Sequence, residues 1–308
     1  MKTPCATAAT RKKIACCKKK STSKKPPPRP PRTSQRFSLS ALLACILITL
    51  AACARPDWGE APAEPEIENG RQLLAAMAAE EAKCPLCRDA DVNVMLKSPL
   101  KDAAVSGYLL LRRPAWIKFV SSNPFGQPLV VATSDGVRFQ QLLMRQKNYA
   151  HGRVFSFLAH NDLPITLALG NWDGWLTGGV GAFKAAEAHV RLDRAGRGLW
   201  FDWPLPRLAK ARSLGENGFR EHILVDPARR LVVARSLTDG KGRIIARFDY
   251  SERRGDGPCP QPERIVVSGL DGGSRIDLLF SDPRAPAECP EHYFQLKKPE
   301  NFHELYMP

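Results

Sequence analysis

The chain has 308 residues, of which 44% are hydrophobic and 25% charged. This composition excludes a collagen-like or disordered chain and a protein that crosses a membrane many times. A net charge of +15 suggests nucleic-acid binding, but residues 1–52 hold twelve Lys and Arg side chains and no Asp or Glu, and the other 256 residues carry 34 basic against 31 acidic side chains. The positive charge therefore belongs to the N-terminal segment, and the near-neutral remainder argues against a nucleic-acid-binding domain.

An uncharged apolar segment follows the basic one. Residues 37–52, FSLSALLACILITLAA, are too few for a membrane-spanning helix, which needs about 20, and they fit the hydrophobic region of a secretory signal. The segment ends in Leu50-Ala51-Ala52-Cys53, which resembles the lipobox of bacterial lipoproteins. The resemblance implies cleavage before Cys53, acylation of Cys53 and, because Ala54 rather than Asp follows, delivery to the outer membrane. The alternatives are a secreted protein cut by the ordinary signal peptidase and an uncleaved short anchor.

A basic, proline-rich stretch precedes the apolar segment and includes KKPPPRPPR over residues 24–32. It is either a basic arm that contacts nucleic acid or the product of a misassigned start codon, and we favour the second interpretation. In both cases residues 1–52 leave with the signal. Residues 53–65 are then the lipidated cysteine and a flexible Pro/Ala/acidic tether, and residues 66–308 are a single folded domain.

One helix is predicted at the start of the domain, over residues 66–83, from a ragged apolar face that includes Leu73, Leu74 and Met77. Pro85 ends it, because proline cannot continue a helix. From there apolar and polar residues alternate with the period of two that indicates β-strands. Such runs cover residues 92–96, 104–111, 116–120, 128–132, 139–144, 188–192, 198–203, 222–225, 231–236, 244–250 and 276–280. Asp-Gly pairs at 135–136, 239–240 and 271–272 lie between runs, as tight turns require.

The predicted fold class is mainly β with a few helices, as a half-open, strongly curved antiparallel β-barrel covered by short helices. Residues 155–183 interrupt the alternation with an apolar, glycine-rich segment. Asp162 is a candidate helix cap with Pro164 in the first turn, and we expect one or two short helices here to cover the open face of the sheet. Plain core packing is the alternative for each residue, but as a set they fit a plug over an apolar cavity.

Two stretches resemble the LolA/LolB-like superfamily of bacterial lipoprotein-localisation proteins. The first is GYLLLRRPAWIKFVSSNPFGQPLVVATSDG over residues 107–136, and the second is FQLKKP over residues 294–299. With the lipobox and the helix before the first strand, the resemblance spans most of the chain after Cys53. It implies a half-open antiparallel barrel closed by helices, with an apolar cavity that accepts acyl chains.

A curved sheet lined by apolar side chains cannot leave its concave face in water, so side chains, a lid or a lipid must fill it. The candidate cavity residues are Leu109, Leu111, Trp116, Phe119, Val130, Phe139, Ile244 and Phe248 on the strands, and Trp172 and Trp175 in the covering segment. Which alternate set of side chains faces inward stays open at this point.

Nine cysteines are present, and five of them, Cys5, Cys16, Cys17, Cys45 and the lipidation site Cys53, belong to the signal and the anchor. An even number remains, Cys84, Cys87, Cys259 and Cys289, which in an oxidising compartment predicts two disulfides in one of three pairings. The cross-pairings attach the N-terminal helix to the last strands, whereas the local pairing does not. The CxxC ends a helix, which favours a structural role over a redox role, and a zinc site would need a second close pair.

No cofactor, metal site or catalytic motif is predicted. The six histidines, His151, His160, His189, His222, His292 and His303, lack metal-ligand spacing, and no GxSxG, HExxH, phosphate loop or dinucleotide fingerprint is present. The glycine-rich residues 178–181 lack the strand and lysine of a phosphate loop. Asp173 and Asp202 are the candidate carboxylates of an enzyme acting on envelope glycans, but solvated turn carboxylates are the simpler interpretation.

We therefore expect a non-enzymatic, lipid-anchored bacterial protein of the outer membrane that faces the periplasm and binds or transfers acylated cargo, either lipoprotein or lipid. Its partners would be the membrane, through acyl chains on Cys53, the cargo and envelope-assembly proteins, with no nucleic acid. The alternative is a non-catalytic accessory lipoprotein that uses the barrel as a protein-binding scaffold in an envelope assembly.

Overall fold

The computed structural model describes residues 56–99, 102–161, 163, 168, 172–181, 187–205, 218–254, 259–270 and 273–308. Residues 56–308 form one compact unit. The signal segment, Cys53 and the predicted cap Asp162 with Pro164 lie outside the described residues.

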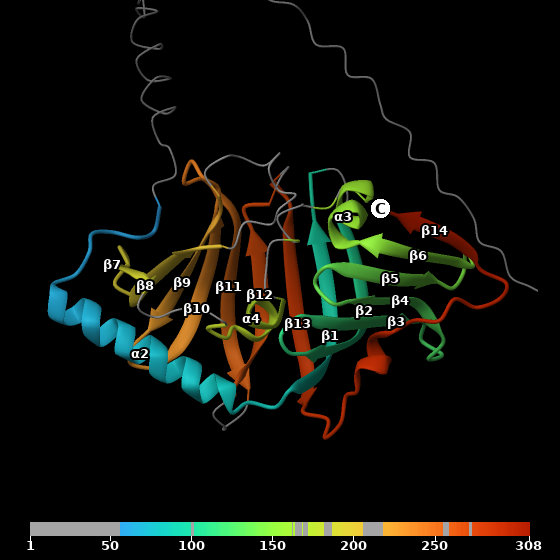
Figure 1. Ribbon diagram of the computed structural model, residues 1–308, viewed down its shortest axis with the longest axis horizontal. Helices are drawn as coiled ribbons and strands as arrows, with labels where there is room; N and C mark the ends of the chain where they lie inside the picture. The colour runs from blue at the N-terminus through green and yellow to red at the C-terminus, as the bar shows by residue number, and fades with distance from the viewer. Residues whose placement is uncertain are drawn as a thin grey trace, which may run out of the picture. The chain divides into compact units, whose positions relative to one another are not determined.

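The elements of the described residues are mostly strands (Figure 1). The helices are α2 (Glu64–Ala82), α3 (Val154–His160), α4 (Trp172–Thr177) and the short 3-10 helix η5 (Glu291–Phe294). The strands before α4 are β1 (Cys87–Lys97), β2 (Asp102–Arg112), β3 (Trp116–Ser122), β4 (Pro128–Ser134), β5 (Arg138–Leu143) and β6 (Asn148–Arg153). Those after it are β7 (His189–Leu192), β8 (Leu199–Pro204), β9 (Arg220–Asp226), β10 (Leu231–Thr238), β11 (Ile244–Arg254), β12 (Gln261–Ser268), β13 (Arg275–Arg284) and β14 (His303–Met307).

All fourteen strands form one curved, unclosed sheet in the order β14-β6-β5-β4-β3-β2-β1-β13-β12-β11-β10-β9-β8-β7 (Figure 1). The neighbours pair antiparallel, except that β14 runs parallel to β6. Pairing of β1 with β13 joins the N-terminal and C-terminal halves of the sheet. The predicted mainly β, half-open antiparallel architecture is therefore confirmed.

Helices α2, α3 and α4 pack on one face of the sheet, which we call the inner face. Leu74 of α2, Leu158 of α3 and Trp175 of α4 belong to the same core cluster as buried strand residues such as Leu109 and Phe248. A smaller cluster of Trp58, Trp200, Leu224 and Ala234 is separate from it. We call the sheet face that carries Trp200, Leu224 and Ala234 the outer face.

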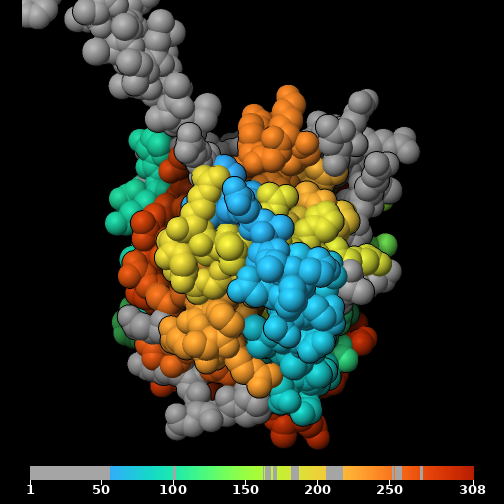
Figure 2. All heavy atoms as spheres, turned by 90° about the vertical axis from the view of Figure 1, so that its left-hand side faces the viewer, coloured from blue at the N-terminus to red at the C-terminus, as the bar shows by residue number. Residues whose placement is uncertain are grey.

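Helix α2 runs across the strands, from a start next to β7 and β8 to an end near β12 (Figures 1 and 2). Gly70 permits this close packing, because a Cβ at this position would lie 3.2 Å from a methyl group of Leu199 and 3.4 Å from the ring of Phe201. Leu74, one turn later, is completely buried. One side of this 19-residue helix thus covers part of the inner face.

The structure differs from the prediction of a flexible tether over residues 53–65. Residues 56–63 lie against the sheet, where Trp58 pairs with Asp193 as a β-bridge and only 8% of its surface is exposed. Asp57 forms ion pairs with Arg247 and Arg197. Burial of Trp58 and the ion pairs of Asp57 hold this segment on the sheet despite its Pro/Ala-rich composition. The domain therefore begins about ten residues earlier than predicted.

Candidate functional site

The two halves of the sheet differ in how completely they are covered. On β9 and β10 most residues of both faces are buried, whereas most residues of β3, β4 and β5 are only partly buried. Helices α2 and α4 pack over the strands from β7 to β12, α4 also approaches β3, and α3 packs on β5 and β6 (Figure 1). The inner face between α4 and α3, where strand side chains are only partly buried, is the candidate region for an apolar ligand.

A row of partly buried apolar side chains follows this region. Each of them packs against the main core and belongs to β1, β3 or β13: Val94, Ile117, Phe119, Ile276, Leu278 and Phe280. The strand pairing explains the row, since Val94 faces Leu278 and Val92 faces Phe280 across β1 and β13. We call these six residues the apolar row.

The structure brings together most of the predicted cavity residues. Leu109, Leu111, Phe139, Trp175 and Phe248 are buried in the main core, and Phe119 and Trp172 pack against it. Val130 pairs with Leu143 and Ser121 and is partly buried. Their position on the inner face fits the predicted lining, although the five buried residues are held by protein atoms.

Two predicted lining residues lie elsewhere. Trp116 stacks near Phe294 of η5, with ring centroids 5.6 Å apart, and because it is three positions from Phe119 it faces the other side of β3. Ile244 packs against the smaller Trp58 cluster. A register shift between Leu237 and Thr238 on β10, opposite the start of β11, accounts for the position of Ile244.

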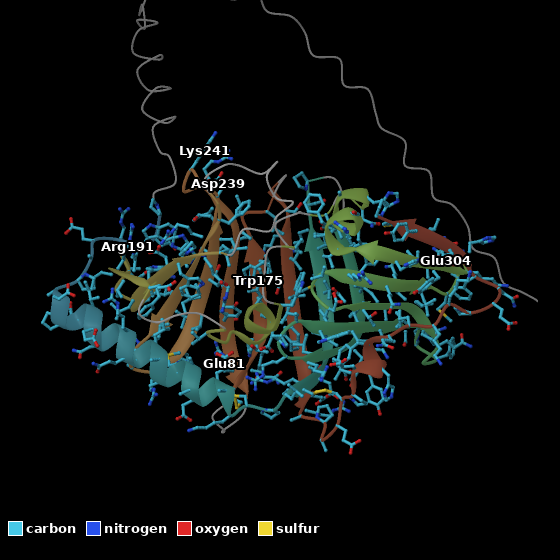
Figure 3. The ribbon with its side chains drawn as sticks, in the orientation of Figure 1. Glu81, Trp175, Arg191, Asp239, Lys241 and Glu304 are labelled. Carbon is cyan, nitrogen blue, oxygen red and sulfur yellow. A yellow bond between two sulfur atoms is a disulfide. The ribbon has the colours of Figure 1, made fainter. Side chains whose placement is uncertain are left out.

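Polar side chains hold α4 on the sheet. Arg235 of β10 donates to Glu221 of β9 and to the carbonyl oxygens of Gly174 and Gly179. Glu221 also accepts a hydrogen bond from Trp175 Nε1 at 3.2 Å, and the hydroxyl of Tyr250 donates to the carbonyl oxygen of Trp175 at 3.0 Å. Burial works against the charge of Arg235, but the carboxylate of Glu221 outweighs it and raises the pKa of Arg235. Trp175 thus lies at the centre of the inner face, as Figure 3 shows, in a fixed orientation.

The two candidate catalytic carboxylates do not share a site. Asp173 lies in the first turn of α4 and lines a cavity with Arg113 and Glu81. Asp202 of β8 lines a different cavity and forms an ion pair with Arg220. Each is almost fully buried rather than solvated in a turn, which corrects the simpler interpretation of both residues.

The cavity beside Asp202 contains His222, whose ring stacks on Trp58 with centroids 4.2 Å apart and planes 7° apart. His222 Nε2 also lies 2.9 Å from the hydroxyl of Thr238. Burial lowers the pKa of His222 to about 4, with the attraction of Asp202 opposing this shift. A neutral histidine packed against tryptophan is a structural contact between the N-terminal segment and the outer face.

The cysteines form two cross-pairs, Cys84–Cys259 and Cys87–Cys289. The first attaches the segment after α2 to the segment before β12, and the second attaches the start of β1 to the chain after β13. Among the residues that the structure describes, no three His, Cys, Asp or Glu side chains lie where they could share a metal ion. In the same part of the chain no helix has the length and apolar character needed to cross a membrane.

Sequence reasoning missed Val94, Ile117, Ile276, Leu278 and Phe280 as site residues. The available signal was the strand period: Ile117 is two positions from Phe119 and therefore shares its face. Cross-strand pairing of β1 with β13 is a contact between residues about 180 positions apart, and no local pattern predicts it.

No family model matches the sequence, and no curated protein is similar to it by sequence. Several solved structures are similar to it in fold. A domain named for outer-membrane lipoprotein sorting, from Vibrio parahaemolyticus, superimposes with a TM-score of 0.50 at 12% identity, over 74% of this chain and 97% of that one. A DUF1329 family protein from Desulfovibrio piger gives a TM-score of 0.52 at 12% identity, again over 74% and 97%.

A LolA superfamily protein from Nitrosomonas europaea is similar at a TM-score of 0.48 and 12% identity, over 73% of this chain and 97% of that one. The similarity to the Vibrio and Desulfovibrio structures is one of fold, and the fold is the one that the sequence resemblance implied.

Proposed function

We propose that this protein binds the acyl chain of a lipoprotein or lipid on the inner face of its sheet. The apolar row carries the proposal: Phe119, Leu278 and Phe280 touch the main core but are only partly buried by it. Each methylene that an acyl chain removes from water contributes about 0.8 kcal/mol, so a row of six such side chains offers useful binding energy. The rest of the inner face is filled by protein and would direct the chain to this row.

The fold supports the same proposal. A solved domain with the same architecture is named for outer-membrane lipoprotein sorting. The location of the ligand is inferred from the apolar row of this chain, and the solved domain supports the proposal through its fold. The proposed activity is binding or transfer without covalent chemistry.

We further propose that the protein is anchored to the bacterial outer membrane by acyl chains on Cys53 and faces the periplasm. The lipobox-like Leu50-Ala51-Ala52-Cys53 supports the anchor, and Ala54 supports the destination. Two disulfides fit an oxidising compartment such as the periplasm. Two or more acyl chains would hold the protein on the membrane, whereas a single chain binds only marginally.

The acyl-binding proposal is tested with purified full-length protein and a fluorescent fatty acid. We expect saturable binding that an unlabelled fatty acid of the same length displaces, and a lipid that remains with the protein through purification and is detected by mass spectrometry. Binding that does not saturate, together with no co-purifying lipid, would contradict the proposal.

A protein-binding scaffold is the second candidate function. It is favoured by large apolar side chains that protrude from loops and from the edge strand: Phe125, Val137 and Tyr306 are 89%, 68% and 66% exposed. Crosslinking in cells that captures one stable protein partner, while lipid binding is absent, would support this alternative.

The anchor is tested separately by labelling cells with a fatty-acid analogue. Wild type should incorporate the label and sediment with membranes, whereas Cys53→Ala should lose both properties, because the thiol is the only proposed attachment site. Cys45→Ala, in the apolar segment of the signal, is the matched control and should label normally. Label retained in Cys53→Ala would overturn the anchor.

A further inference from the structure

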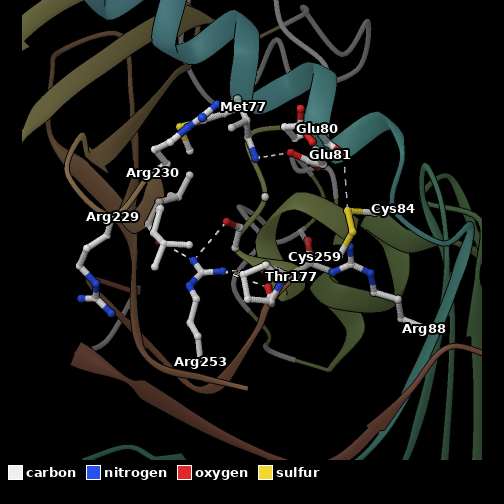
Figure 4. Close-up of a pocket in the computed structure, with 16 residues that line it drawn as sticks. Met77, Glu80, Glu81, Cys84, Arg88, Thr177, Arg229, Arg230, Arg253 and Cys259 are labelled. Atoms are coloured by element: carbon white, nitrogen blue, oxygen red, sulfur yellow. Dashed lines mark hydrogen bonds between the residues drawn. A yellow bond between two sulfur atoms is a disulfide. The ribbon is translucent and has the colours of Figure 1, made fainter. Parts of the chain in front are cut away.

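A cavity of about 280 Å³ lies beneath the C-terminal half of α2 (Figure 4). Its walls are α2, the turn after α4, the start of β1, the β9–β10 turn, the end of β11 and the Cys84–Cys259 disulfide. Four of the lining residues are arginines, Arg88, Arg229, Arg230 and Arg253, against two acids, Glu80 and Glu81. Figure 4 shows the guanidinium groups of Arg88 and Arg253 directed toward the cavity and that of Arg229 directed away from it.

Arg88 is the buried cation of this cavity without a partner. Only 7% of its surface is exposed, yet its side chain makes no hydrogen bond or ion pair with the described part of the chain. Burial lowers the pKa of Arg88, the charges of Asp173 and Glu81 oppose this, and Arg113 adds repulsion. None of its guanidinium nitrogens is completely enclosed, so its five N–H donors are accessible from the cavity.

Arg253 supplies a second positive charge that no described carboxylate neutralises by direct contact. Its guanidinium donates only to carbonyl oxygens, at 2.5 Å to Val232, 3.3 Å to Gly178 and Pro260 and 3.4 Å to Thr177. Burial lowers the pKa of Arg253 to about 10, and repulsion from Arg229 and Arg88 contributes. The two arginines are therefore close enough to repel each other, and an anion between them would relieve the repulsion.

The acids of the cavity are already engaged. Glu81 accepts hydrogen bonds from the backbone N–H groups of Val180 at 2.6 Å and Gly181 at 3.3 Å. Glu80 forms an ion pair with Lys83 at 3.0 Å. A Cβ at Gly179 would lie 2.4 Å from a carboxylate oxygen of Glu81, so Glu81 packs directly against this turn. What the cavity offers to an incoming group is positive charge.

We propose that this cavity binds a phosphate group, with Arg88 as its principal ligand and Arg253 supplying the second charge. Guanidinium groups match phosphate oxygens with pairs of parallel hydrogen bonds, which makes arginine the usual side chain for such sites. The cavity is smaller than the roughly 300–1,000 Å³ of sites that enclose a drug-sized molecule, so it suits a free phosphate or the phosphate of a lipid head rather than a whole lipid.

The proposal does not depend on acyl binding, because the apolar row and this cavity share no residue. It is tested by calorimetric titration of the full-length protein with two probes, inorganic phosphate and dihexanoyl-phosphatidic acid. Arg88→Gln should weaken binding of the effective probe about 10- to 100-fold, as expected for loss of a charge-assisted pair of hydrogen bonds. Arg138→Gln, which replaces an exposed arginine on β5, is the control and should bind as wild type.

Thermal unfolding without phosphate separates a ligand role from a structural one. If Arg88 serves to bind a ligand and does not stabilise the fold, replacing it should not lower the stability of the ligand-free protein. The Tm of Arg88→Gln should therefore equal or exceed that of wild type. Binding of both probes with equal affinity would identify the phosphate itself as the ligand, and binding of the lipid alone would identify a lipid head; either supports the proposal. Equal binding by wild type and Arg88→Gln, no binding of either probe by wild type, or a lower Tm for Arg88→Gln would overturn it.

Discussion

Asp173 lies in the first turn of α4 with 6% of its surface exposed. Burial raises its pKa from the ordinary value of 3.8 to about 6, and the attraction of Arg88 and Arg113 only partly opposes this. Because the folded state binds this proton more tightly than the unfolded chain, the contribution of Asp173 to stability is fully present below about pH 4 and is lost as the pH rises through 6. Above that pH the folded protein carries an unfavourable buried carboxylate.

We therefore expect Asp173→Asn to be more stable than wild type at pH 7, by up to about 3 kcal/mol, since each pKa unit corresponds to about 1.4 kcal/mol. The difference should shrink as the pH falls and be small at pH 4, where the carboxyl is neutral in the folded state and about half ionised in the unfolded chain. Urea unfolding followed at pH 4, 5, 6 and 7 measures it. Asp202→Asn is the control and should lose stability at pH 7, because Asp202 pairs with Arg220. An Asp173→Asn protein less stable than wild type at pH 7 would refute this assignment of charge.

At the residue scale the sequence predicted which strands carry core residues better than it predicted the face on which each residue lies. Leu109, Leu111, Phe119 and Phe248 lie on the inner face, because alternation marks one face of each strand. Trp116 was grouped with Phe119 although an odd spacing puts them on opposite faces. Arg88 could not have been recognised, since an arginine in an alternating strand normally faces water, and only the packing of α2 and α4 buries this one.

The elements that cover the inner face are held by the disulfides as well as by packing. Cys84 and Cys259 are 175 residues apart, so their bond restricts the unfolded chain strongly. Arg113 adds a hydrogen bond to the carbonyl oxygen of Glu81 at 2.8 Å, near the end of α2. Together they fix the C-terminal end of the helix over the arginine cavity.

Replacing Cys84 and Cys259 together by serine should lower the free energy of unfolding by about 2–5 kcal/mol, through loss of the constraint on the unfolded chain. Hydrogen exchange should also increase in the last turns of α2. The pair Cys87→Ser and Cys289→Ser is the matched control, because it should reduce stability similarly but leave exchange in α2 nearly unchanged. If neither double variant differs from wild type in stability, the disulfides are dispensable to the fold.

At the element scale eleven of the predicted runs correspond to strands, and β6, β12 and β14 were missed. In β6, Asn148–Arg153, polar residues and Gly152 replace the alternation. In β12, Pro262 interrupts an otherwise good pattern. The last strand, β14, is an edge strand with most residues exposed and pairs parallel to β6, a long-range contact with no local signature.

At the scale of the whole molecule, the sequence indicated the curved sheet and its helical cover because alternation, short turns and the apolar middle segment all agree. It could not indicate how much of the inner face the protein fills for itself. Trp175, Glu221 and Arg235 fill the inner face at β9 and β10, and only tertiary packing determines that the apolar row on β1, β3 and β13 is left partly buried. The proposed acyl site is thus the part of the core that the protein covers incompletely, and not the interior of an open barrel.

The central claim is most directly tested by a matched pair on β13. Leu278 lies in the apolar row, and its neighbour Leu279 is 37% exposed on the opposite face. In displacement titrations with a fluorescent fatty acid, Leu278→Asn should bind at least about 10-fold more weakly than wild type, as expected for loss of a buried leucine contact, while Leu279→Asn stays within about twofold. Equal affinities in the two variants, with both folded by circular dichroism, would contradict acyl binding on the inner face.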